Sequence, residues 1–226
     1  MSTVHPYRAR VSALTLRRVL RPAVWLGVVL ALSACALPEK PTAPSVFDLG
    51  MIQAPSPNAP GSSLAVAVAL NDIEAPLALD GTGVLYRLAY AQAQQLRPYA
   101  NARWSMAPAQ LVQQRLRERL AQGAAVLNRT QAASLRNSGV LSVELTVQLE
   151  EFCQVFTSAQ NSQGQIRLRA TLMQGNRLLG QKVFTAQQAA SAADAPGGVQ
   201  ALASATDVAV GELQAWVTQL SVVAKP

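Results

Sequence analysis

The chain is poor in the side chains that most enzymes use. Its 226 residues include one histidine, His5, and two cysteines, Cys35 and Cys153. Residues 1–34 have the features of a leader that is removed, so the mature protein is expected to contain no imidazole. This excludes Ser-His-Asp and Cys-His nucleophiles, histidine-rich zinc sites and the commonest general base. We therefore predict no enzymatic activity, no metal site and no cofactor.

Other catalytic patterns are also missing. The sequence has no G-x-x-x-x-G-K phosphate loop, and residues 81–83 (Gly-Thr-Gly) lack the third glycine and the following helix of a dinucleotide fingerprint, so a turn is expected there. Glu150 and Glu151 are neighbours on a predicted strand and point to opposite sides of it. An envelope enzyme that uses carboxylates alone, Glu144, Glu150 and Glu151, stays open as an alternative.

Charge is scarce, at 14% of the residues, and the formal net charge of +7 is concentrated at the N-terminus. Five arginines lie within residues 1–34, which leaves fourteen basic against twelve acidic residues and a net charge of about +2. No run of Lys or Arg follows Cys35, so no nucleic acid partner is expected. Arg115, Arg117 and Arg119 alternate with apolar positions, and we expect them to form a solvated helix face.

The first 35 residues have the organisation of a bacterial lipoprotein signal peptide. Five arginines precede an apolar run over residues 23–32, which is too short to span a bilayer. Leu32, Ser33 and Ala34 then lead to Cys35, the lipobox pattern at which such precursors are acylated and cut. Acyl chains on Cys35 would anchor the protein essentially irreversibly. Ala36 stands where lipoproteins of the inner membrane often carry aspartate, so we predict the periplasmic face of the outer membrane.

Three segments are predicted: a signal peptide over residues 1–34, a lipidated tether over 35–61 and one domain over 62–226. The tether contains six prolines, which favour extended chain. Within it, residues 46–50 place Phe47 and Leu49 at strand spacing, so a short edge strand there would pair with the domain and shorten the reach of the tether. With Cys35 acylated, Cys153 has no partner and is predicted to be a buried apolar residue.

The domain shows both strand and helix periodicity. Alternating apolar residues over 141–149 predict a half-buried strand, and Phe152 takes the apolar parity after Glu151, which predicts a β-bulge at Glu150 and Glu151. A two-residue turn, Gly175-Asn176, predicts a hairpin. The expected strands are 64–70, 84–89, 141–152, 166–172 and 178–184, and the expected helices are about 108–122 and 199–220. The predicted fold is α+β, a mainly antiparallel sheet of about five strands with two helices on one face.

In their order and spacing, these residues resemble the ABC-type transport auxiliary lipoproteins, which accompany MCE-domain lipid transporters. The resemblance covers most of the mature chain. It is carried by the lipobox, residues 47–50 and 83–87, Tyr99, Arg103, Trp104 and Pro108, the three-stranded meander that ends at Phe184, and Trp216. It implies a non-catalytic periplasmic module, an MCE-domain protein as partner, and phospholipid or sterol-like lipid as cargo. Self-association is left open.

Four residues are candidates for a partner-binding patch, because Tyr, Trp and Arg are favoured at the centres of interfaces. They are Tyr86, Arg87, Arg103 and Trp104. The competing hypothesis is that the aromatic residues pack beneath the first helix while the arginines pair locally. Trp216 on an apolar helix stripe is expected in the core. A structural or assembly lipoprotein of the envelope, such as a pilotin or a secretion accessory, is the alternative function.

Overall fold

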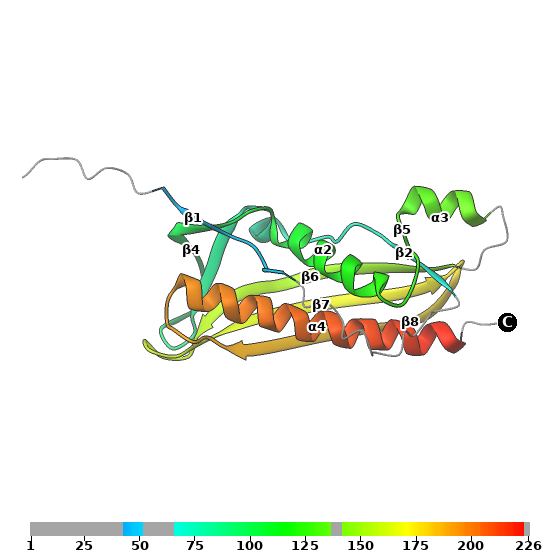
Figure 1. Cartoon of the computed structure of the whole chain (residues 1–226). Helices are drawn as coiled ribbons and strands as arrows, with labels where there is room; N and C mark the ends of the chain where they lie inside the picture. Colours follow the sequence, from blue (N-terminus) through cyan, green and yellow to red (C-terminus); the bar gives the residue numbers. More distant parts are fainter. Residues whose placement is uncertain (1–42, 52–65, 137–141, 224–226) are drawn as a thin grey trace, which may run out of the picture. The chain divides into compact units, whose positions relative to one another are not determined.

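The computed structural model describes residues 43–51, 66–136 and 142–223, shown in Figure 1. All of them belong to the second of two compact units, Ala43–Pro226. The predicted signal peptide, the lipobox residues Leu32, Ser33 and Ala34, the anchor Cys35 and most of the predicted tether lie outside the described residues.

Three long consecutive strands pair with one another in antiparallel order, as the sequence predicts. β6 (Ser142–Phe156) pairs with β7 (Ser162–Gln174), which pairs with β8 (Arg177–Ala189). The predicted hairpin joins the last two strands, and Gly175 adopts a φ of 56°, a left-handed conformation that favours glycine. The register of β6 on β7 shifts between Leu149 and Glu151, so the predicted bulge is confirmed.

The other edge of β6 is shared by two short parallel strands. β2 (Ala67–Leu70) pairs with residues 142–145, and β3 (Gly83–Leu88) pairs with residues 154–156. β5 (Val126–Leu127) continues the sheet beyond β2. Beyond β3 lie β4 (Gln92–Trp104), which is antiparallel to it, and β1 (Ser45–Phe47), which is parallel to β4.

The predicted α+β class is correct, but the details of the sheet are not. The described residues form eight strands in a mixed sheet, and not about five mainly antiparallel ones. Four of the strand pairs are parallel and three are antiparallel. The sequence did not predict β4, because the N-terminal half of this strand is exposed on both faces and shows no apolar alternation. The strands β2, β3 and β5 have only two to six residues, and their own residues do not indicate whether they pair in parallel or antiparallel order.

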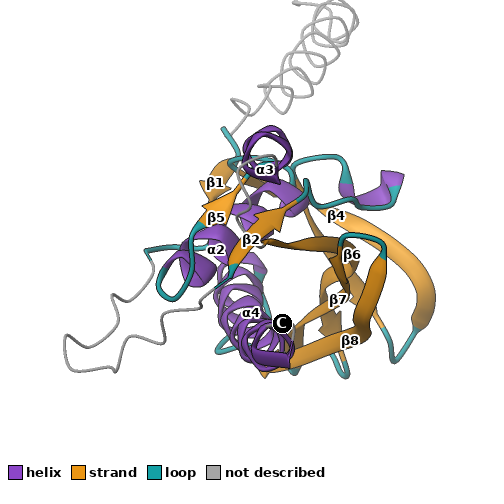
Figure 2. Cartoon of the chain, turned by 90° about the vertical axis from the view of Figure 1, so that its right-hand side faces the viewer, coloured by secondary structure: helices purple, strands orange, loops and turns teal. Residues whose placement is uncertain are grey.

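Two long helices pack on the sheet. α2 (Pro108–Ala121) and α4 (Ala195–Val223) run in front of β6 and β7 in Figure 1. Viewed along α4 in Figure 2, the strands curve around one side of it. The sequence did not predict α3 (Arg129–Arg136), the 3-10 turn η1 (Leu77–Leu79), or the start of α4 at Ala195, ahead of the two glycines. Asp194 begins α4, because its carboxylate accepts a hydrogen bond of 2.8 Å from the Gly197 amide.

One hydrophobic core lies between the helices and the sheet. It joins the inward side chains of β6 and β7 to one stripe of each helix, and small residues of α4 (Ala201, Ala205 and Ala209) are buried in it. The close approach needs Gly164 on β7, since a Cβ there would lie 2.4 Å from the Leu202 amide nitrogen. Trp216 is partly buried against this core, with its ring 5.7 Å from that of Phe184.

Candidate functional site

β3 and β4 form a two-stranded ribbon with an unusual composition. Residues 83–104, which we call the ribbon, contain three tyrosines and three arginines but no aspartate or glutamate. The ribbon includes all four predicted partner-binding residues. Tyr, Trp and Arg are enriched where proteins bind each other. A partner can contact only those of these side chains that are exposed.

Two tyrosines hold the ribbon on the rest of the sheet. The ring centroids of Tyr86 and Tyr99 are 4.6 Å apart, and Tyr86 also meets Phe156 edge to face at 5.9 Å. The Tyr99 hydroxyl donates a 2.8 Å hydrogen bond to Gln154 Oε1, and Gln154, which is fully buried, donates one of 2.7 Å to Ser162 Oγ. Burial raises the pKa of Tyr99 to about 12. This buried polar network fixes the base of the ribbon.

Trp104 belongs to the core. Its side chain is 2% exposed, and its ring lies 5.4 Å from that of Phe152. A partner cannot contact an indole that is buried in this way, so the packing hypothesis is correct for Trp104.

Two of the ribbon's arginines pair locally. Arg87 donates a 2.5 Å hydrogen bond to the Ala93 carbonyl. It also faces the buried Cys153 thiol, whose pKa is raised by burial, an effect that Arg87 partly offsets. Arg97 donates to the side chains of Gln92 and Gln95. Cys153 is buried as predicted.

The exposed part of the ribbon lies at its turn and along its outer edge. Tyr90, in the turn, is 52% exposed, and Arg103 is exposed beside β1. β1 pairs only with residues 102–104 of β4, so within the described part of the chain no strand covers the outer edge of residues 92–101. An open edge of this kind can accept an extended segment of a partner, and Pro98 is typical of such an edge.

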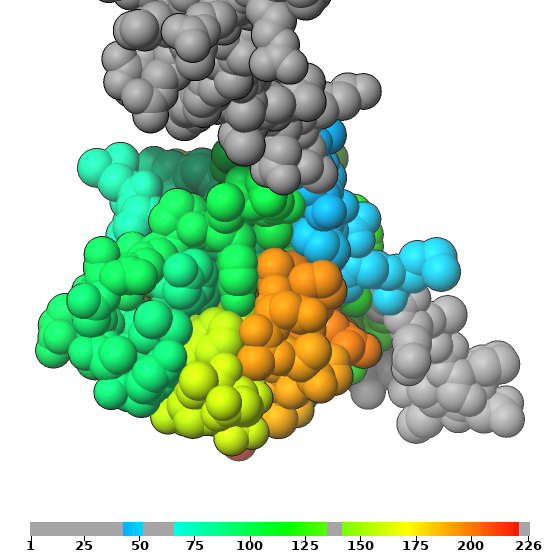
Figure 3. All heavy atoms as spheres, turned by 90° about the vertical axis from the view of Figure 1, so that its left-hand side faces the viewer, coloured from blue at the N-terminus to red at the C-terminus, as the bar shows by residue number. Residues whose placement is uncertain are grey.

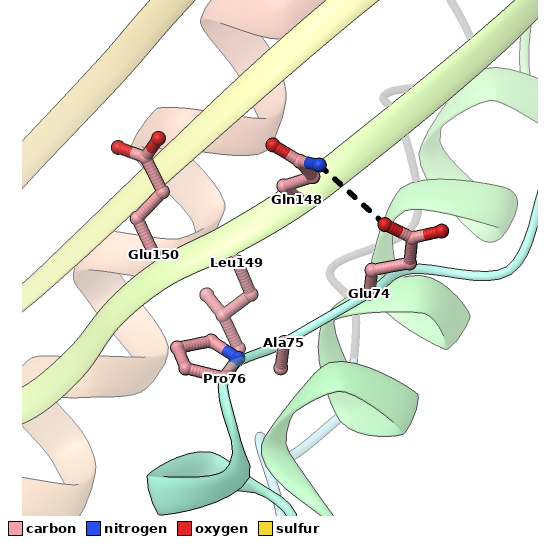
Figure 4. Close-up of a pocket in the computed structure, with 6 residues that line it drawn as sticks. All are labelled: Glu74, Ala75, Pro76, Gln148, Leu149 and Glu150. Carbon is pink, nitrogen blue, oxygen red and sulfur yellow. Dashed lines mark hydrogen bonds between the residues drawn. The ribbon is translucent and has the colours of Figure 1, made fainter.

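A shallow pocket of about 330 Å³ lies where neither β2 nor β3 covers β6. Figure 4 shows its lining: Leu149 points toward Ala75 and Pro76, while Gln148 reaches Glu74 with a hydrogen bond of 3.4 Å. Its six lining residues are Glu74, Ala75, Pro76, Gln148, Leu149 and Glu150.

The carboxylates of the enzyme alternative are engaged with their neighbours. Glu150 forms ion pairs with Arg167 and Arg169, at 2.7 and 2.6 Å, and the hydrogen bond from Arg167 is the main reason that its pKa is lowered. Glu144 accepts a hydrogen bond from Asn71, and Glu151 accepts one from Gln165. An ionised, doubly paired Glu150 is unsuited to donate a proton. Across the residues that the structure describes, no group of three His, Cys, Asp or Glu side chains could hold a metal ion.

Arg115, which the sequence did not identify as buried, binds the N-terminal segment to the domain. We call residues 45–50 the strap. Its β1 part confirms the predicted edge strand, and the Phe47 carbonyl accepts a 2.7 Å hydrogen bond from the Ser105 amide. Arg115 of α2 donates to the carbonyls of Leu49 and Gly50, the latter at 2.8 Å, and its guanidinium lies 3.2 Å from Asp207 of α4.

The prediction that Arg115 belongs to a solvated face with Arg117 and Arg119 is therefore wrong. It is 5% exposed. The signal that identifies it is its position on the buried stripe of α2, next to Leu116 and three and four residues after Val112 and Leu111. A charged residue on an apolar stripe is buried only when a partner satisfies it.

Comparison with known proteins agrees with this fold. Protein XCC0632 from Xanthomonas campestris is 16% identical, with a TM-score of 0.66 over 80% of this chain and 98% of that protein. A crystal structure of an uncharacterized protein is 14% identical, with a TM-score of 0.60 over 78% of this chain and 99% of its own. No curated protein matches the sequence.

The described part of the chain contains no helix that is both long and apolar enough to cross a membrane. Residues 47–213 match the family model of the ABC-type transport auxiliary lipoprotein component. The match begins within the strap and ends in α4, so it includes the whole ribbon. The chain belongs to the ABC-type transport auxiliary lipoprotein component family.

Proposed function

We propose that the protein is a non-catalytic auxiliary component of an MCE-type ABC lipid transport system, anchored by Cys35 in the outer membrane on its periplasmic face. The observation that carries this proposal is the family match over residues 47–213. The lipobox before Cys35 and the lack of imidazole after it support an anchored binding module. Phospholipid or sterol-like lipid is the proposed cargo of the transporter.

We propose the ribbon as the docking surface for the MCE-domain partner. The ribbon has exposed Tyr90 and Arg103, no acidic residue, and an open β4 edge over residues 92–101. Such a surface fits an extended, acidic segment, which would pair with the edge through its backbone and with Arg103 through a carboxylate. Tyr86 and Arg87 contribute by holding the ribbon in place.

Two experiments test the function. Metabolic labelling with palmitate and membrane fractionation should mark the wild-type protein in the outer membrane and leave Cys35→Ala unlabelled and absent from the outer membrane. Affinity purification of the wild-type protein should then recover an MCE-domain protein. Recovery of a secretin or another assembly machine instead would favour the alternative, a structural or assembly lipoprotein.

A charge reversal tests the docking surface. Arg103→Glu should weaken recovery of the partner at least tenfold, because a like charge would face the acidic segment. Arg177→Glu is the matched control, since Arg177 is also exposed but lies at the hairpin between β7 and β8, away from the ribbon. Equal losses for both variants would contradict a docking role of the ribbon.

A further inference from the structure

The strap changes how far the domain can stand from its anchor. We infer that the lipid anchor holds the domain at Ser45 and not at the start of β2. The corner around β1 then lies close to the bilayer surface. This inference rests on the proposed lipidation of Cys35. It goes further in naming the surface that faces the lipid.

Three independent contacts fix the strap. Its backbone pairs with β4, with Ser45, Val46 and Phe47 opposite Ala102, Arg103 and Trp104. Leu49 inserts its side chain into the core. The buried guanidinium of Arg115 binds the carbonyls of Leu49 and Gly50 and is itself paired with Asp207. The strand pairing comes from β4 and the guanidinium from α2, where Asp207 of α4 holds it, so the strap is bound by both layers of the domain.

Chain length then limits the reach. Ser45 lies ten residues after Cys35, and ten residues span at most about 35 Å when fully extended. If the domain instead began at Ala67, thirty-two residues would separate it from the anchor and the limit would be about 110 Å. The prolines of residues 52–65 then lie between two segments of the same domain and add nothing to the reach.

The corner nearest to the anchor is formed by the strap and the start of α4. Figure 3 shows β1 beside the first turns of α4 on this face. A largely apolar groove of about 460 Å³ lies between them, lined by Val46, Phe47, Leu49, Pro196, Val199 and Ala203, among others. Val46 is 66% exposed. The β7–β8 turn lies at the opposite end of the long strands, as Figure 1 shows.

Two insertions of equal length test the inference. Twenty Gly and Ser residues are placed either between Thr42 and Ala43, upstream of the strap, or between Asn58 and Ala59, downstream of it; neither insertion interrupts the described residues. The lipidated proteins are inserted into vesicles of phosphatidylethanolamine and phosphatidylglycerol. A donor dye on Gln200→Cys, at the start of α4, reports energy transfer to acceptor lipids, and Asn176→Cys reports from the far turn.

The upstream insertion should raise the root-mean-square span between Cys35 and Ser45 from about 17 Å to about 30 Å, and so move the Gln200 probe away from the bilayer by about 10 Å. The downstream insertion should leave it unchanged, and the probe at position 176 should be the more distant one in the unextended protein. Equal increases for the two insertions would overturn the inference, because they would show that the strap does not stay bound to the domain.

Failure of the lipid anchor gives a different result. In that case the unextended protein does not bind the vesicles, and the proposed localisation is wrong. The free Cys35 thiol then takes one spin label and Gln200→Cys takes the other. An upstream insertion that alone lengthens the distance between these labels still supports the strap as the fixed point, and equal lengthening overturns it.

Discussion

Arg115 and Asp207 join the two long helices, with 3.2 Å between the guanidinium and the carboxylate. The two partners differ in exposure, at 6% for the Arg115 side chain and 53% for that of Asp207. The buried partner also donates to two backbone carbonyls of the strap, while the exposed partner can be hydrated. Loss of the Arg115 side chain should therefore lower the stability of the protein more than loss of the Asp207 carboxylate.

Replacing Arg115 with methionine should lower the free energy of unfolding by about 2 kcal/mol. The variant keeps most of the apolar side chain but leaves the carbonyls of Leu49 and Gly50 without their charged donor. Asp207→Asn should cost less than about 1 kcal/mol, because exposed ion pairs contribute little. Urea unfolding measures both. Equal effects would mean that the ion pair, and not the strap, accounts for the contribution of Arg115.

Gly164→Ala should destabilise the protein by about 1–3 kcal/mol through overpacking. The added methyl group would lie 2.5 Å from the Ala201 carbonyl carbon and 2.4 Å from the Leu202 nitrogen, and backbone atoms of a long helix cannot move aside as a flexible side chain would. Gly81→Ala is the matched control, since no atom lies within 4 Å of its Cβ position. Thermal unfolding compares them, and a neutral Gly164→Ala would refute the close approach of α4.

Tyr99→Phe should change the alkaline stability of the protein. The pKa of Tyr99 is raised from 10.0 to about 12 by burial, so its neutral form is favoured in the folded state. Its contribution to stability is complete below pH 10 and is lost as the pH rises from 10 to 12. Tyr99→Phe should be about 1 kcal/mol less stable at pH 8, because Gln154 loses a donor.

Denaturant midpoints between pH 8 and 12 provide the measurement. The wild type should lose stability faster than Tyr99→Phe above pH 10, so that the two curves converge. The buried Cys153 thiol, whose pKa is also raised, is present in both proteins and does not affect the difference. Parallel curves would show that Tyr99 ionises as freely in the folded state as in the unfolded one.

Glu150→Gln should remove an acid-sensitive contribution. Hydrogen bonds and charge from Arg167 and Arg169 hold the pKa of Glu150 below its ordinary value of 4.5. Its contribution is therefore present above pH 4.5 and is lost as the pH falls below that value. The wild type should exceed Glu150→Gln by less than about 1 kcal/mol at pH 7, because these side chains are partly exposed, and the difference should vanish near pH 3.

Urea midpoints at both pH values measure this difference. Glu212→Gln on the exposed side of α4 controls for the loss of one negative charge. A difference of the same size at pH 3 would mean that Glu150 acts through its shape and not through its charge.

The elements predicted from the sequence are those with one face in the core and one in water. β6 to β8 and α2 show this in their apolar periodicity, and the parity change at Phe152 identified the bulge. β4 could not be predicted, because an exposed strand has no apolar face to reveal it. The parallel pairing of β2 and β3 depends on contacts far apart in the sequence.

The predicted patch stays a prediction, but the structure shows which of its residues are exposed and which are buried. The Tyr and Arg content indicated the ribbon, whereas the burial of Trp104 depends on Phe152, which the sequence does not place beside it. Arg115 was assigned to solvent by the charge pattern of its neighbours, although its helical position was apolar. Composition thus suggested a patch, and only the packing distinguished its exposed residues from its structural ones.

The extra residue in β6 lies between the part of the strand that pairs with β2 and the part that pairs with β3 of the ribbon. Before it, odd-numbered side chains such as Val147 and Leu149 face the helices; after it, even-numbered ones such as Phe152 and Gln154 do. Deleting Glu151 would remove the extra residue and leave Phe152 and Gln154 facing the helices, whereas inserting one more residue after Glu151 would turn Gln154 away from Tyr99. A one-residue insertion at this position would thus detach the ribbon from Gln154 while leaving the composition of the protein almost unchanged.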